Sequence, residues 1–169
     1  VWLGVEWQPM TFALAQALGA QDATRDGARG LLVQHVYAHS PAERLGIAVG
    51  DILLSLGLPG QPEEFDLHPT GKARELYFGP PFTGSFPRRM WRPRRNYLTA
   101  FLQVIGADRT VLLRRLHDGA ELVQEVELEK APDDFDTVRA LTNHTLGLSV
   151  KPLTYEVRSV LRIEEGLGV

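Results

Sequence analysis

The chain has 169 residues, a net charge of −3, 44% hydrophobic and 23% charged residues, and no cysteine. This length allows one domain with a full core or slightly more, and the composition is that of a globular protein. The small net charge argues against general binding to nucleic acid or anionic lipid. The absence of cysteine excludes disulfides, thiolate metal sites and a cysteine nucleophile. No apolar run reaches membrane-spanning length and no signal peptide is visible, but the chain begins inside a patterned segment, so we interpret it as a fragment of a longer protein.

The first stretch, residues 2–8, combines a glycine turn with a short strand. Leu3, Val5 and Trp7 alternate with other residues and therefore share one face of an extended strand. Gly4 permits a backbone conformation that other residues avoid and lets another chain come close. Free N–H groups in such a turn, beside an open strand edge, can capture the terminal carboxylate of a peptide. The simpler alternative is a turn that leads into a core strand.

The next elements are predicted from propensity and end signals. Residues 9–19 are predicted to form a short helix, because alanine and leucine favour helices and Gly19 stands where a helix would end. Residues 21–30 are predicted to be a polar loop. Residues 31–37 are rich in apolar and β-branched side chains and are predicted to form a buried strand.

A second short helix is predicted between two strands. Ser40 is a suitable N-cap, Pro41 fits the first helical position and Gly46 closes the turn. A tight turn at residues 49–51 then leads into a strand at residues 52–56. The sequence therefore predicts strand, helix and strand in close succession.

A helix and a hairpin are predicted further along the chain. The helix covers residues 96–106 and has an amphipathic pattern. Strands at residues 110–116 and 121–128 flank an Asp-Gly turn, which is a strong hairpin signal. His117 lies in this turn and is predicted to be solvated.

Residues 58–95 differ from the rest of the chain in amino-acid composition and are predicted to be an insert. They contain seven prolines, so they cannot form one long element. Glu63, Glu64 and Asp66 stand near the start, and a basic cluster around Trp91 stands at the end. This cluster comprises Arg88, Arg89, Arg92, Arg94 and Arg95. It is either a solvated loop or a surface that contacts an acidic partner, another domain or the upstream residues of a ligand.

Residues 40–53 carry a family signal. They read Ser-Pro-Ala-Glu-Arg-Leu-Gly-Ile-Ala-Val-Gly-Asp-Ile-Leu, which resembles the SPA-x-x-x-G-ϕ-x-x-GD-ϕ-ϕ run of PDZ domains, where ϕ is apolar. The predicted element order, with the apolar-Gly-apolar loop first, resembles the circularly permuted PDZ domain of bacterial HtrA/DegP-like trypsin-type serine proteases. The resemblance covers residues 2–56 and 96–128 and leaves out the insert. It implies a mixed α/β (α+β) fold, a small partly open β-barrel or sandwich with two or three helices.

An internal repeat indicates a second copy of the same unit. Residues 146–155 repeat residues 3–12 at an offset of 143 (146 − 3), with Leu, Gly, Pro and Thr recurring. We therefore predict a PDZ domain at residues 1–130, a linker at 131–145 and the truncated beginning of a second PDZ domain at 146–169. This tandem order resembles DegP.

The partial second copy is predicted to need cover, because one strand and one helix cannot bury their own apolar faces. We expect this cover from the first domain or from a second copy of the chain in a homo-oligomer. The side chains concerned are Leu146, Leu148, Val150, Val157 and Leu161.

The resemblance also implies a peptide-binding site. Its backbone part would be the carboxylate loop and the strand edge that follows, and its wall would be one face of the helix at 96–106. The residues implied are Trp2, Leu3, Gly4, Val5, Glu6 and Trp7 in the first part and Tyr97, Ala100, Phe101 and Val104 in the wall. The alternative is that core side chains or the insert fill this groove. The residues before the loop, which often bring a basic side chain in this family, are not in this chain.

The implied function is a module that recognises C-terminal or extended peptide segments by β-strand addition. It would be the substrate-recognition or regulatory part of an HtrA/DegP-like serine protease of the periplasm or cell envelope. The chain lacks the Gly-x-Ser-Gly-Gly nucleophile motif, so we expect no catalysis by this chain and predict no catalytic residue, cofactor, metal, nucleic acid or membrane partner. The alternatives are a non-catalytic scaffold or secretion PDZ and the PDZ domain of a membrane-embedded metalloprotease.

Overall fold

The computed structural model describes residues 1–67, 97–133, 135 and 138–163. The chain divides into two compact units. Unit 1 comprises Val1–Phe86 and Arg94–Lys130, and unit 2 comprises Pro87–Pro93 and Ala131–Val169. Each unit is described by itself.

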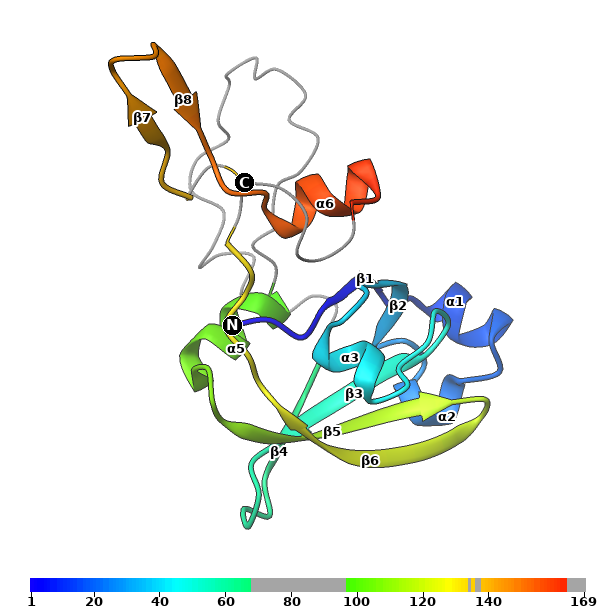
Figure 1. The fold of residues 1–169 in the computed structure, drawn as a ribbon. Helices are drawn as coiled ribbons and strands as arrows, with labels where there is room; N and C mark the ends of the chain where they lie inside the picture. The colour runs from blue at the N-terminus through cyan, green and yellow to red at the C-terminus, as the bar shows by residue number, and fades with distance from the viewer. Residues whose placement is uncertain (68–96, 134, 136–137, 164–169) are drawn as a thin grey trace, which may run out of the picture. The chain divides into compact units, whose positions relative to one another are not determined.

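Unit 1 is a small mixed α+β domain in which short helices accompany an antiparallel sheet (Figure 1). Its elements are β1 (Val5–Pro9), α1 (Phe12–Ala17), α2 (Gln21–Thr24), β2 (Leu31–Val36), α3 (Pro41–Arg44), β3 (Ile52–Gly57), β4 (Glu64–Asp66), α5 (Tyr97–Ile105), β5 (Thr110–His117) and β6 (Ala120–Glu127).

The six-stranded sheet has the order β1-β2-β3-β5-β6, and β4 pairs with β3. The first half of β3 pairs with β2 through Leu53 and Ile52, and its second half pairs with β4 through residues 55–57. The pairings do not close a continuous barrel among the described residues. An isolated bridge between Trp2 and Glu129 connects the N-terminal segment to the chain after β6. A small, partly open barrel or sandwich was predicted. The structure shows a mixed α+β domain with an open antiparallel sheet.

The core of unit 1 lies between the sheet and helices α3 and α5. Leu31, Leu53 and Leu113 from the strands are completely buried, and Leu98 and Leu102 of α5 are 2% exposed. These two helix residues are separated by four positions, so they lie on one helical face. A second, smaller cluster forms where α1 and α2 cover Ile52 and Leu54.

The predicted strands at 31–37, 52–56, 110–116 and 121–128 are confirmed, each with a shift of one residue at one or both ends. The short helix α3 is confirmed with its cap, since the Ser40 hydroxyl accepts a hydrogen bond from the Glu43 N–H at 3.1 Å. The Asp-Gly hairpin between β5 and β6 is also confirmed.

Two local predictions were wrong. The helix predicted from residue 9 begins at Phe12, because Pro9 belongs to β1 and the Thr11 hydroxyl caps the helix by accepting the Leu14 N–H. The polar loop at 21–30 contains α2, which Asp22 helps to start. The first part of the predicted insert forms β4, which pairs with β3.

Unit 2 contains a hairpin and a helix among its described residues. Strand β7 (Leu141–Asn143) pairs with β8 (Leu148–Val150), and helix α6 (Tyr155–Leu161) follows. Strand β7 lies within the stretch expected to be a linker. Within this unit, Leu146, Leu148, Val150 and Leu161 are 67%, 57%, 49% and 61% exposed, and Val157 is partly buried. The two strands and the helix thus leave most of their apolar side chains uncovered.

Candidate peptide-binding site

The glycine loop before β1 lies tightly against the start of α3. Gly4 has φ +84°, and a Cβ placed on it would lie 2.1 Å from the Cβ of Ser40. The carbonyl of Leu3 accepts the Ala42 N–H at 2.9 Å, and the carbonyl of Gly4 accepts the Tyr37 N–H at 2.9 Å. Only glycine fits this position, both for its backbone conformation and for its distance to Ser40. The loop is therefore held rigidly by its carbonyl groups.

The N–H groups of this loop divide into used and unused donors. The Trp2 N–H donates to the carbonyl of Glu129 at 2.9 Å. Among the described residues, the N–H groups of Leu3 and Gly4 have no hydrogen-bond partner, although both residues are buried. Most backbone donors of buried residues are paired, so two adjacent residues without a partner for their N–H groups are unusual. The loop thus offers fewer donors than predicted, but the two that remain are adjacent.

Strand β1 is the outer strand of the sheet at one end. Among the described residues it pairs with β2 alone, with Val5 opposite Val36 and Trp7 opposite Val33. Val33 uses its N–H and carbonyl toward the other side, with Asp51 and Gly50 at 2.8 and 3.0 Å.

Trp7, opposite Val33, must therefore direct its own N–H and carbonyl away from β2. The N–H and carbonyl of Val5 also point away from β2. The preceding residue, Gly4, is hydrogen-bonded to Tyr37, and hydrogen-bonded pairs alternate with non-bonded pairs in antiparallel strands. The outer edge of β1 therefore presents backbone groups in the spacing of a strand.

The side chains beside this edge are apolar and partly buried. Val5 and Trp7 of β1 and Phe101 and Ile105 of α5 all pack against the same core cluster. The indole Nε1 of Trp7 is buried without a hydrogen-bond partner among the described residues. The edge strand and the helix thus flank one apolar region.

The remaining predicted wall residues are distributed differently. Val104 is 82% exposed, so its side chain makes little contact within the domain. The side chains of Tyr97 and Ala100 lie outside the described part of the structure, although both residues belong to α5. On the other face of β1, the Glu6 carboxylate accepts a hydrogen bond from the Tyr37 hydroxyl at 2.5 Å. The structure therefore brings the backbone residues and Phe101 together and leaves the pocket itself undefined.

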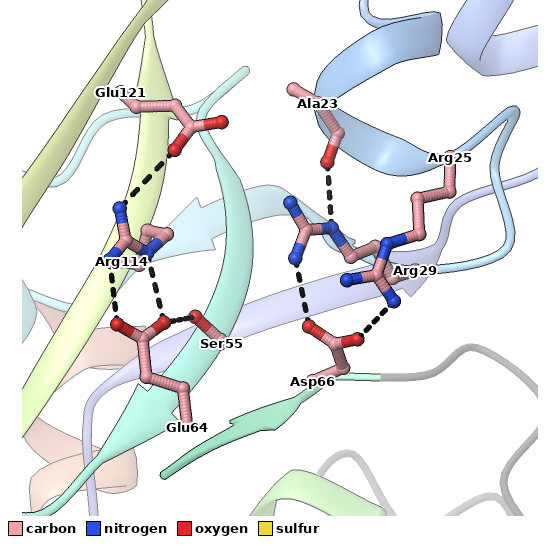
Figure 2. Close-up of polar contacts among 8 residues, drawn as sticks. All are labelled: Ala23, Arg25, Arg29, Ser55, Glu64, Asp66, Arg114 and Glu121. Carbon is pink, nitrogen blue, oxygen red and sulfur yellow. Dashed lines mark hydrogen bonds and ion pairs between the residues drawn. The ribbon is translucent and has the colours of Figure 1, made fainter. Parts of the chain in front are cut away.

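Two ion-pair groups fasten β4 to the domain (Figure 2). The Arg114 guanidinium donates to both oxygens of Glu64, at 2.6 and 2.9 Å, and also pairs with Glu121. On the other side, Arg25 and Arg29 donate to the two oxygens of Asp66 at 2.6 and 2.8 Å. Glu64 and Asp66 are two residues apart and hold this short strand at both ends.

The Glu64 carboxylate is strongly stabilised in its charged form. The hydrogen bond from Arg114, and next the one from the Ser55 hydroxyl, lower the pKa of Glu64 from 4.5 to about 2. The same carboxylate raises the pKa of Arg114. Both side chains are about one-third exposed, at 34% and 31%, so water screens the pair and its contribution to stability is about 1 kcal/mol.

A separate buried network joins the turn before β3 to β5. The carboxylate of Asp51 pairs with Arg115, and both side chains are 4% exposed. Asp51 also accepts the Ala48 N–H at 3.0 Å and lies 2.6 Å from Nδ1 of His117. The prediction of a solvated His117 was wrong, because this residue ends β5 and its ring faces Asp51. These contacts secure the fold and lie outside the proposed site.

Other candidate chemistry is limited among the described residues. No group of three or more potential metal ligands is found among them, and none of their helices is long and apolar enough to cross a membrane. The arginine cluster around Trp91 lies outside the described residues.

The fold and the site define a small mixed α+β domain with a glycine loop feeding an open strand edge. No protein-family model matches the chain. A stretch of 61 residues, 36% of this chain, is 41% identical to the probable periplasmic serine endoprotease DegP-like of Rhizobium meliloti (strain 1021). The matched stretch covers 11% of that protein, so the chain spans about a tenth of its length.

Solved structures give a coarse likeness to the same kind of protein. Two structures titled HtrA-type protease AlgW with decapeptide, one of them of a variant, match 78% and 79% of this chain and 29% and 30% of theirs. Both are 21% identical, with TM-scores of 0.46 and 0.43. The sequence match makes the chain distantly similar, over part of its length, to a DegP-type protease.

Proposed function

We propose that unit 1 is a PDZ-like module that binds C-terminal or extended peptide segments by adding them to the edge of β1. The observation that carries this proposal is the pair of N–H groups at the buried residues Leu3 and Gly4, which have no partner among the described residues, beside a strand edge that is likewise unpaired among them. Two adjacent donors suit the two oxygens of a terminal carboxylate.

The site dictates the direction of the ligand. The loop precedes β1, so a chain whose end is held by Leu3 and Gly4 must run antiparallel to β1 toward Pro9. Its backbone would pair with the outward N–H and carbonyl groups of Val5 and Trp7. Its last side chain would enter the apolar region between β1 and Phe101. Such binding is expected at micromolar affinity, about −8 kcal/mol.

The direct test is titration of the whole 169-residue chain with a library of C-terminal peptides and their amidated forms. Amidation removes the charge that the two N–H groups would bind, so we expect at least a tenfold loss of affinity. Equal binding of both forms would refute capture of a carboxylate.

A second probe tests strand addition separately. In an antiparallel pair only every second residue of the ligand directs its N–H toward β1. Methylating those nitrogens one at a time should weaken binding, and methylating the intervening ones should not. A flat response along the peptide would exclude pairing with β1.

For the parent protein, we propose an HtrA/DegP-like serine protease of the periplasm or cell envelope, in which this module recognises substrates or regulates activity. The partial identity to a DegP-like endoprotease supports this assignment. A scaffold or secretion protein and a membrane-embedded metalloprotease are the alternatives. Sequence upstream of Val1 would decide between these three. A trypsin-like triad would support the serine protease, and a transmembrane His-Glu-x-x-His helix would support the metalloprotease. The absence of both motifs would support the scaffold or secretion protein.

We further propose that unit 2 begins a second module of the same kind. Strand β8 and helix α6 stand at the repeat positions of β1 and α1, and Gly147 shares the positive φ of Gly4. Its exposed apolar residues would then be covered by the rest of that module or by a second copy of the chain. Analytical ultracentrifugation of this chain and of a chain extended at its C-terminus distinguishes these two kinds of cover. Dimers of this chain would indicate cover by a second copy, and a monomeric extended chain would indicate cover by the rest of the module.

A further inference from the structure

The first strand of the insert places an aromatic ring on the helix beside the proposed groove. Phe65 lies opposite Leu56 in the β3–β4 pairing, and Leu56 is 1% exposed. Because directly paired residues share a face of the sheet, the Phe65 ring lies on the core side. There its ring centroid is 5.4 Å from that of Phe101, at an interplanar angle of 56°. Phe65 nevertheless stays 46% exposed, so half of the ring remains available to another molecule.

Backbone hydrogen bonds connect β4 to the far end of the edge strand. The Gly30 N–H donates to the carbonyl of Leu67 at 2.6 Å, and the Gly30 carbonyl accepts the Met10 N–H at 3.1 Å. Leu67 follows Phe65 by two residues, and Met10 directly follows β1. Phe65 therefore lies toward the Pro9 end of β1, the end to which the upstream residues of an antiparallel ligand run.

The chain on both sides of Phe65 is anchored by ion pairs. Its two sequence neighbours, Glu64 and Asp66, are held by Arg114 on one side and by Arg25 and Arg29 on the other (Figure 2). A backbone that is already ordered at this position loses little conformational freedom on binding, and this favours affinity.

We infer that Phe65 is a specificity-determining residue of this site, forming with Phe101 an aromatic wall that selects an apolar side chain upstream of the ligand's last residue. This inference rests on the proposed function. Side chains alternate along a strand, so the ligand positions on the same face as the terminal side chain are the third and fifth from its end. One or both of these positions would meet the wall.

The experiment compares peptides that differ only at the third or fifth residue from the end, with leucine, phenylalanine, serine or aspartate there. Binding to the whole chain is measured for the wild type, Phe65→Ala, Phe65→Leu and the control Val123→Ala. Val123 is 48% exposed on β6, so the control removes a similarly exposed apolar side chain. Circular dichroism and thermal unfolding establish that each variant folds.

We expect the wild type to prefer the apolar peptides by about three- to tenfold, as for one partly buried apolar contact. Phe65→Ala should abolish that preference, whereas Phe65→Leu and Val123→Ala should keep most of it. Sensitivity to amidation should remain in all four proteins. If Phe65→Ala keeps the preference for apolar peptides while amidation still weakens binding, this inference alone is overturned. Loss of the amidation effect in the wild type would instead overturn the proposed function.

Discussion

The two copies of the repeat have the same local structure in different surroundings. Gly4 and Gly147 have φ of +84° and +64°, and each precedes a short strand. Thr11 and Thr154 are the N-cap residues of α1 and α6, which begin 143 positions apart (155 − 12). Similar residues at the same spacing therefore produce the same turn, strand and helix twice.

The burial of equivalent side chains differs greatly between the copies. Leu3 is 4% exposed, whereas Leu146 is 67% exposed. The loop donors differ as well, since the Asn143 side chain accepts the N–H of Leu146 at 3.0 Å and nothing among the described residues accepts that of Leu3. The comparison teaches that a repeated segment specifies its own secondary structure. The burial of its side chains and the pairing of its loop N–H groups depend on the rest of the domain.

The glycine pair should show the largest difference. Gly4→Ala introduces a Cβ that would meet Ser40 at 2.1 Å in a positive-φ position, whereas at Gly147 nothing lies within 4 Å. We expect a loss of about 4 kcal/mol or more for Gly4→Ala, from clash and strain, and about 1 kcal/mol for Gly147→Ala, from strain alone. Urea unfolding followed by fluorescence measures both, and equal losses would contradict the difference between the two turns.

The leucine pair should differ by somewhat less. Leu3→Ala leaves a cavity in the core of unit 1 and should lower the free energy of unfolding by about 3 kcal/mol. Leu146→Ala should change it by less than about 0.5 kcal/mol, because its side chain is exposed. A large effect of Leu146→Ala, growing with protein concentration, would show that a second chain covers unit 2.

The ion pair at β4 should have the smallest effect. The folded-state pKa of Glu64 is about 2, below its usual 4.5. Its stabilisation is therefore complete above about pH 5 and is lost as the pH falls toward 2. Glu64→Gln should remove about 1 kcal/mol at pH 7 and flatten this part of the pH profile. Glu125→Gln, at an exposed residue of β6, serves as the control, and a profile unchanged by Glu64→Gln would refute this role.

Much of the fold was predictable from local patterns. The cap at Ser40, the Asp-Gly turn and the alternation in β1 all depend on residues within a few positions of one another. For the same reason the sequence indicated the glycine loop and the apolar face of α5. Local signals of this kind specify an element without its partners.

Several of the missed features depend on distant partners. Strand β4 has three residues and no clear pattern. It forms because β3 leaves an edge open and because arginines after α2 and in β5 neutralise its carboxylates. His117 is held by Asp51, 66 residues away along the chain. No short-range signal identified Phe65 as a neighbour of Phe101.

The sequence by itself determined where the chain turns, extends and coils in both copies of the repeat, because capping, glycine conformation and side-chain alternation act over a few residues. Only the tertiary structure decided which copy is covered, which loop donors stay unpaired and which ring lies beside α5. These outcomes depend on strand pairing and ion pairs between residues far apart in the chain, and the energy of such contacts exists only once the domain has assembled.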